Sequence, residues 1–132
     1  MAKALDYIGI ARMSGGIETG EDNTKSLIKS GKAKLAILAC DASPAARRRA
    51  EGYVFETKVP LLEAPYTKEQ ISAIAGRPGC SMAAFTDLGL SASFVSALCT
   101  EYGTRYGPVS EILEQRLRRA KARKTGKGRK HA

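Results

Sequence analysis

The stretch Lys34-Leu-Ala-Ile-Leu-Ala-Cys40 constrains the fold most, because every residue after the lysine is apolar. A strand with one face in water alternates apolar and polar residues, whereas a short unbroken apolar run is typical of a strand covered on both faces. Helices packed on each side of a sheet provide such cover. The run therefore predicts an α/β protein whose sheet lies between two helical layers.

The rest of the chain alternates helical and strand-like patterns around this run. Helices are expected to start near residues 5, 21, 44, 67, 90 and 109, and strands are expected over 16–20, 59–64 and 82–85. Ser43 and Thr67 are suitable N-caps, although Glu69 comes one place early for a capping box after Thr67. Pro60 belongs at a strand start or a sheet edge.

These patterns predict a three-layer α/β/α sandwich with about four mixed strands and a basic C-terminal helical tail. We expect residues 1–104 to form the domain, and residues 105–132 to form a final helix and the tail. No internal repeat of 20–50 residues is visible.

The formal net charge of +9 is concentrated in the tail. Nine basic residues and no acidic one lie between Arg116 and Lys130, whereas residues 1–115 hold thirteen of each sign and are neutral. From Lys124 onward a disordered arm that contacts nucleic acid nonspecifically fits best. A membrane-surface helix is weaker, because the apolar stripe ends at Leu117, and a solubilising extension without a partner stays open.

Composition disfavours several other classes. No apolar run reaches a membrane span, the N-terminus lacks a signal-peptide pattern, and three separated cysteines fit a reducing cytoplasm. The sequence has a single histidine, His131, which is too few for a His-based metal site and disfavours a Ser-His or Cys-His nucleophile system. It also has no glycine-rich loop of the kind that binds phosphate. Asp41 and Asp87 remain as carboxylates, but spacing alone does not make them an acid–base pair. We expect no enzyme, cofactor or metal.

One segment resembles a known family. The residues Gly20-Glu-Asp-Asn-Thr-Lys-Ser-Leu-Ile-Lys-Ser-Gly31, together with the following strand and Asp41-Ala-Ser-Pro44, resemble the kink-turn RNA-binding ribosomal-protein superfamily. The upstream Gly9-Ile-Ala-Arg12-Met-Ser-Gly15 is similar to its bacterial YlxQ branch. The resemblance covers residues 5 to about 98 and implies a monomeric, cytoplasmic protein that binds structured RNA, in a ribosome or another ribonucleoprotein.

The resemblance also implies the contact residues. In the family, the start of the second helix reads guanine edges in a sharply kinked RNA, and a loop before the last core strand packs on a flipped-out nucleotide. The positions carried over to this chain, with their neighbours, are Thr19, Gly20, Glu21, Asp22, Asn23, Lys25, Ser26 and Lys29 in the first wall, Arg77, Pro78 and Cys80 in the second, and Asp41 at the same end of the sheet.

Two positions depart from the family pattern. Asp22 stands where the family has Asn or Lys, and Ser26 stands where it has Lys. Each lost phosphate contact weakens RNA binding. An alternative therefore stays open, in which the chain is a protein-interaction module of the same fold that touches nucleic acid only through the tail. Gly20 to Asn23 can also be an ordinary helix start, Asp41 to Pro44 a capping turn, and Arg47 to Arg49 a solvated helix face.

Overall fold

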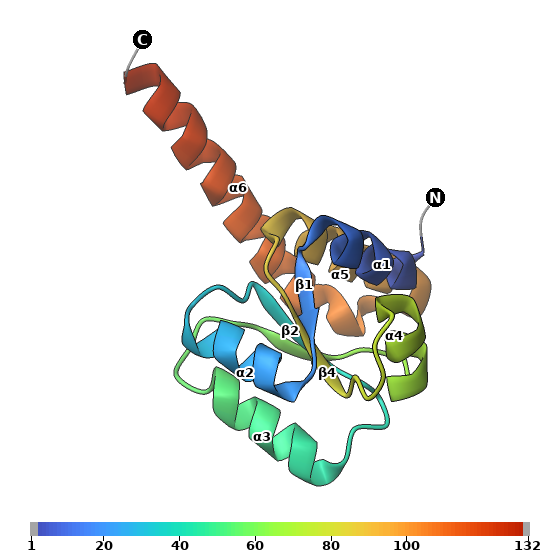
Figure 1. The fold of residues 1–132 in the computed structure, drawn as a ribbon. Helices are drawn as coiled ribbons and strands as arrows, with labels where there is room; N and C mark the ends of the chain where they lie inside the picture. Colours follow the sequence, from blue (N-terminus) through green and yellow to red (C-terminus); the bar gives the residue numbers. More distant parts are fainter. Residues whose placement is uncertain (1–2, 131–132) are drawn as a thin grey trace.

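The computed structural model describes residues 3–130, with side chains placed as far as Lys124; residues 1–2 and 131–132, including the only histidine, lie outside the described part. The elements, in chain order, are α1 (Ala4–Ser14), β1 (Ile17–Thr19), α2 (Glu21–Lys29), β2 (Leu35–Leu38), α3 (Pro44–Val54), β3 (Leu61–Glu63), α4 (Lys68–Ala75), β4 (Met82–Phe85), α5 (Leu88–Tyr102), the 3-10 turn η1 (Thr104–Tyr106) and α6 (Gly107–Lys130). The four strands form one sheet between two helical layers, as predicted (Figure 1).

The strand order is β1-β4-β2-β3, and β4 runs antiparallel to both of its neighbours, while β2 and β3 are parallel. The last residues of β1, β2 and β3 therefore lie at the same end of the sheet as Met82, the first residue of β4. Pro60 immediately precedes the edge strand β3, which confirms its expected place. Segments that follow β1 and β2 are thus brought next to the loop before β4.

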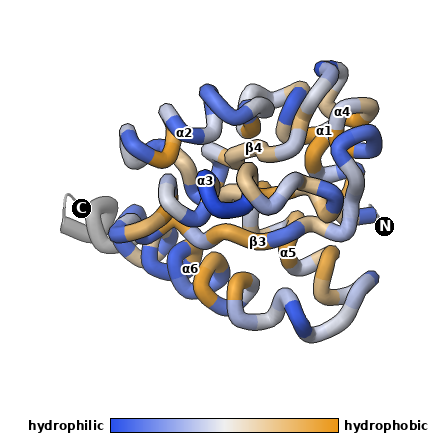
Figure 2. Tube along the Cα trace, turned by 90° about the horizontal axis from the view of Figure 1, so that it is seen from below, coloured by the Kyte–Doolittle hydropathy of each residue, from blue (hydrophilic) through white to orange (hydrophobic). Residues whose placement is uncertain are grey.

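All four residues of β2 are buried, which confirms that the sheet is covered on both faces. Leu35 and Ile37 belong to a large core with residues of α1 and α5, whereas Ala36 packs with Ile28 of α2. Successive side chains of a strand point to opposite faces, so an all-apolar strand requires a helical layer on each side. Figure 2 shows strongly hydrophilic segments along α3 and α6.

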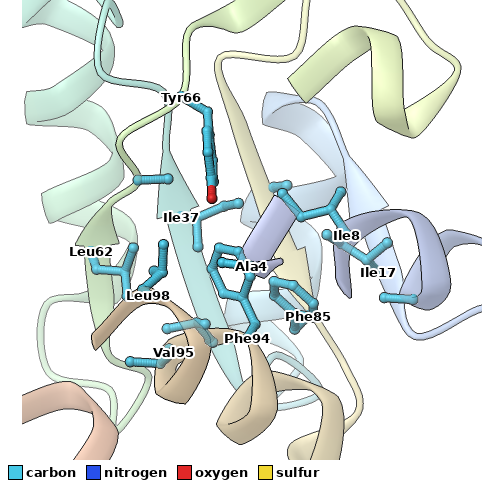
Figure 3. Close-up of a cluster of buried hydrophobic side chains, with 14 of the residues drawn as sticks. Ala4, Ile8, Ile17, Ile37, Leu62, Tyr66, Phe85, Phe94, Val95 and Leu98 are labelled. Carbon is cyan, nitrogen blue, oxygen red and sulfur yellow. The ribbon is translucent and has the colours of Figure 1, made fainter. Parts of the chain in front are cut away.

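The larger core lies between the sheet and the layer that contains α1, α4 and α5 (Figure 3). Phe85 of β4 and Phe94 of α5 are fully buried there, with ring centroids 5.1 Å apart. Ile8 of α1 and Leu98 of α5 complete its centre. Aromatic pairs of this kind add to the stabilisation from apolar burial.

The helix ends follow the predicted signals with one correction. Ser43 Oγ accepts a hydrogen bond from Ala46 N, and Thr67 Oγ1 accepts one from Gln70 N. The Gln70 side chain bonds back to Thr67 N, so α4 does have a capping box. The acidic Glu69 stands one place early, but the amide of Gln70 at the third helical position serves equally.

The C-terminal helix begins as part of the core and not as a separate tail. Tyr106 and Leu113 are buried in the larger core, and Leu117 packs against it. Beyond that point α6 projects from the body and continues to Lys130 (Figure 1). The expectation of a disordered arm from Lys124 was wrong, because the backbone stays helical past the end of the apolar stripe.

Replacing Leu113 with Ala is expected to lower the free energy of unfolding by about 2–5 kcal/mol, because it opens a cavity in the core. Ile112→Ala is the matched control, since Ile112 lies next to it on α6 but is 39% exposed, against 0% for Leu113. Urea unfolding of both variants measures the difference. Equal losses for the two positions would mean that α6 does not belong to the core.

Candidate nucleic-acid interface

One end of the sheet gathers three of the segments singled out in the sequence. Gly20 N donates to Met82 O at 2.9 Å, which joins the start of α2 to the start of β4. Ala39 N donates to Ser81 O at 2.9 Å, which places Asp41, two residues further on, beside the same loop. The two walls of the candidate site, the α2 start and the loop before β4, are therefore neighbours.

The first wall begins at Gly20, whose φ of 97° lies in the region that disfavours side chains. Because Gly20 has no side chain, nothing from it covers the first N–H groups of α2, and no side-chain cap forms there. A helix start of this kind presents free N–H groups and the positive end of the helix dipole to solvent. It is suited to contact an anionic group such as phosphate.

Asn23 is held in place by its own strand–helix junction. Its Nδ2 donates to Thr19 O at 3.0 Å, and the neighbouring Thr24 Oγ1 donates to Gly20 O at 2.7 Å. Thr19 itself is buried, so it supports the wall through its carbonyl and not through its side chain. The remaining N–H and the carbonyl oxygen of the Asn23 amide are the groups that can pair with a base edge.

Asp22 and Ser26 are both exposed and lie one turn apart on α2. The structure thus brings the two departures from the family pattern onto one face of the helix. Lys25 points elsewhere, since its Nζ lies 5.6 Å from the ring centroid of Tyr53 in α3. Lys29 lies in the last turn of α2, at the end away from the walls, and its contact with RNA stays a prediction.

Glu21 forms contacts with α3 that were not predicted from the sequence. Both carboxylate oxygens accept hydrogen bonds from Arg49 of α3, at 2.6 and 2.9 Å, and the Tyr53 hydroxyl donates a further one. The hydrogen bonds from Arg49 and then Tyr53 lower the pKa of Glu21 from 4.5 to about 2. The i,i+4 spacing of Arg49 and Tyr53 places them on one face of α3, and this pattern was the only indication in the sequence that they act together.

The arginine run of α3 therefore does more than form a solvated face. Arg47 pairs with Glu63 at the end of β3, and Arg49 pairs with Glu21. Both pairs are substantially exposed, so each contributes little to stability by itself. Their effect is to neutralise two carboxylates close to the candidate interface.

The second wall is only partly as predicted. Arg77 and Pro78 are exposed, but Cys80 is 1% exposed and its thiol lies 3.2 Å from Arg77 O, inside the turn. Ser72 Oγ accepts a hydrogen bond from Cys80 N, which fixes this inward position. The expectation that Cys80 supplies exposed apolar surface was wrong, because its spacing from Pro78 does not reveal which side of the turn it occupies.

Arg12 is a neighbour of the second wall that was not among the predicted contacts. Its guanidinium lies against Gly76, where an added Cβ would come within 2.8 Å of it. Arg12, Thr19 and Arg77 line one surface pocket of about 320 Å³. The segment around Arg12 was noted in the sequence, but Arg12 and Gly76 are far apart in the chain, so their contact could not be predicted from spacing.

The two carboxylates considered for catalysis act as structural acceptors. Asp41 Oδ1 accepts from Lys68 N at 2.8 Å, at the start of α4, and Asp87 Oδ1 accepts from Leu90 N at 2.9 Å, at the start of α5. Both are exposed, so neither lies in an enclosed apolar pocket. Within the described residues, no group of three His, Cys, Asp or Glu side chains is placed to hold a metal ion.

Residues 2–95 match the model of the Ribosomal protein L7Ae/L30e/S12e/Gadd45 family. The chain belongs to this family. It is 32% identical over 76 residues to the RNA-binding protein YlxQ of Enterococcus faecium, an alignment that covers 58% of this chain and 73% of that protein. The resemblance seen in the sequence is thereby confirmed.

Two solved structures share the family fold. A Bacillus halodurans protein of unknown function superposes with a TM-score of 0.67 at 19% identity, over 74% of this chain and 98% of its own. A 15.5 kD RNA-binding protein of Giardia lamblia superposes with a TM-score of 0.60 at 17% identity, over 73% of this chain and 82% of its own.

None of the helices within residues 3–130 is long and apolar enough to cross a bilayer.

Glu21→Gln is expected to make stability less dependent on pH. The folded-state pKa lies below the unfolded one, so the contribution of Glu21 is complete above about pH 4.5 and is lost as the pH falls through about 2. Urea unfolding of the wild type and the variant should therefore differ near pH 5 and converge toward pH 2. Glu51→Gln, at an exposed position of α3, is the control, and an equal pH response for both variants would contradict the prediction.

Proposed function

We propose that the chain is a non-catalytic RNA-binding protein that recognises a kinked RNA with the surface formed by the α2 start and the loop before β4. The hydrogen bond from Gly20 N to Met82 O carries the proposal, because it holds the two walls side by side. Membership of the family and the similarity to an RNA-binding protein, YlxQ, support RNA as the partner.

The chemistry of the surface suits this role. The N–H groups at the start of α2 contact a phosphate, and the Asn23 amide pairs with a base edge. Arg12 and Arg77, whose side chains line one pocket, supply cations to the backbone on the far side of the kink. Pro78 offers the exposed apolar surface on which an unstacked base packs.

The acidic residues at this surface differ in their expected effect on RNA binding. Glu21 is paired with Arg49, so its charge is compensated before any RNA approaches. Asp22 is exposed and repels phosphate, and Ser26 offers no cation one turn later. We therefore propose that binding is weaker than that of a relative with the full family pattern, while the kinked shape is still preferred.

The proposed partner is ribosomal RNA or the RNA of another ribonucleoprotein, bound by a monomer in the cytoplasm without a cofactor. The basic residues of α6 add nucleic-acid affinity without sequence preference. The exposed Asp22 favours a second candidate, a protein-interaction module of the same fold. The two differ in one measurable property, which is the preference for a kinked RNA over a straight one.

Ser26→Lys is expected to raise the affinity for a kink-turn RNA about tenfold, which is about 1.4 kcal/mol, a gain typical of one hydrogen bond to a charged group. Affinity for a straight duplex should rise much less. The measurement is the ratio of the two affinities at a fixed salt concentration. A gain in the ratio cannot arise from misfolding, and Ser30→Lys at the other end of α2 is the control for added charge.

Asn23→Ala is expected to lower the same ratio, because it removes the base-edge contact. Its unfolding midpoint must be measured in parallel, since Asn23 also bonds to Thr19 O. If the wild type shows no preference for the kinked RNA, and neither Ser26→Lys nor Asn23→Ala changes the ratio, the protein-interaction candidate is favoured.

A further inference from the structure

A second polar surface lies at the other end of the sheet. Lys34 N donates to Phe85 O at 2.7 Å, so Lys34 sits where β2 begins and β4 ends, opposite the Gly20–Met82 contact. Around this point, the end of α2, the segment that precedes β3 and the side of α6 enclose a groove of about 340 Å³. The groove shares no lining residue with the two walls of the candidate interface.

Five cationic side chains line this groove and no acidic one does: Lys34, Lys58, Arg116, Arg119 and Arg123. None of the five forms an ion pair with another described residue. The remaining lining is small or apolar and includes Ile28, Val59 and Leu88. Unpaired cations gathered in a concave site raise the local concentration of anions.

The three arginines come from one side of α6. Residues 116, 119 and 123 fall within about 60° of one another around a helix that turns by 100° per residue. The same side borders Leu113 and Leu117, which hold α6 against the core. The row is therefore fixed relative to Lys34 and Lys58, although it belongs to the segment expected to act as a separate tail.

We propose that this groove binds the phosphodiester backbone of an RNA segment distinct from the kinked one. The inference rests on the RNA-binding part of the proposed function and not on kink recognition. In this inference, the arginines of α6 bind RNA in a defined groove together with Lys34 and Lys58 of the body.

The arrangement favours a polyanion over a single phosphate. Arg116 and Arg123 are separated by seven residues, or about 10 Å along the helix, which exceeds the size of one phosphate group. A nucleic-acid strand carries a charge about every 3.4 Å along its axis, so successive phosphates can meet successive guanidinium groups. Arginine forks also bind phosphate oxygens in pairs, which favours a phosphate backbone over a diffuse anionic surface.

The test compares full-length variants that lose the same charge. Lys34→Gln combined with Lys58→Gln removes the two body cations, and Arg48→Gln combined with Lys68→Gln removes two exposed cations that do not line the groove. Binding to a straight duplex RNA is measured over a range of salt concentrations, with unfolding midpoints as a check on folding. The groove pair should lower affinity about tenfold and reduce the salt slope by about 2, since each phosphate contact contributes about 0.9.

The control pair should change both quantities far less, and the kinked-to-straight ratio should stay the same in all variants. Equal losses in the two pairs, or no binding of wild type to the straight duplex at low salt, would overturn the inference. So would a groove pair that loses binding to phosphatidylserine vesicles while its RNA binding stays intact. If binding to the straight duplex depends on the groove but the protein shows no preference for kinked RNA, the groove inference is supported and the kinked-RNA proposal is contradicted.

Discussion

The fold depends on the burial of β2 and β4 on both faces. Leu35, Ile37 and Phe85 fill the larger core, while Ala36 and Ala84 pack toward α2 and α3. Since apolar side chains occupy both faces of the central strands, polar chemistry is left to the strand ends and to the outer surfaces of the helices. The antiparallel pairing of β2 and β4 then decides which segments meet: Gly20 lies beside the start of β4, and Lys34 beside its end.

Those two strand ends differ in how their charges are balanced. At this end of the sheet Glu21 is paired with Arg49, Asp22 is exposed, and Arg12 and Arg77 line a pocket with Thr19, so charges of both signs are present. At the other end the charged residues that line the groove are all cationic. The groove combines two lysines of the net-neutral residues 1–115 with three arginines of the basic segment that follows, so its local charge is positive although the body alone has no net charge.

The sequence predicted the elements whose signals are local. The apolar run from Leu35, the N-cap Ser43 and the helix start after Gly20 depend on neighbours a few residues away, and each was found as expected. Side-chain direction was not predictable in the same way. Cys80 turns inward because Ser72 holds its N–H, and Arg49 reaches Glu21 across two helices. Such contacts are set by tertiary packing, which residue spacing does not encode. The RNA-contacting roles of the two walls stay predictions.

The helix dipole of α2 gives the two surfaces different requirements. Its N-terminus carries partial positive charge, which favours the exposed carboxylate of Asp22 there and, in the proposed function, a phosphate. Its C-terminus carries partial negative charge, and Ile28 and Gly31 from that end line the groove. A phosphate there is repelled unless side chains supply compensating cations. Lys34, Lys58 and the arginines of α6 meet this requirement, so an RNA-binding role at the far end of α2 depends on the C-terminal helix in a way that the N-terminal surface does not.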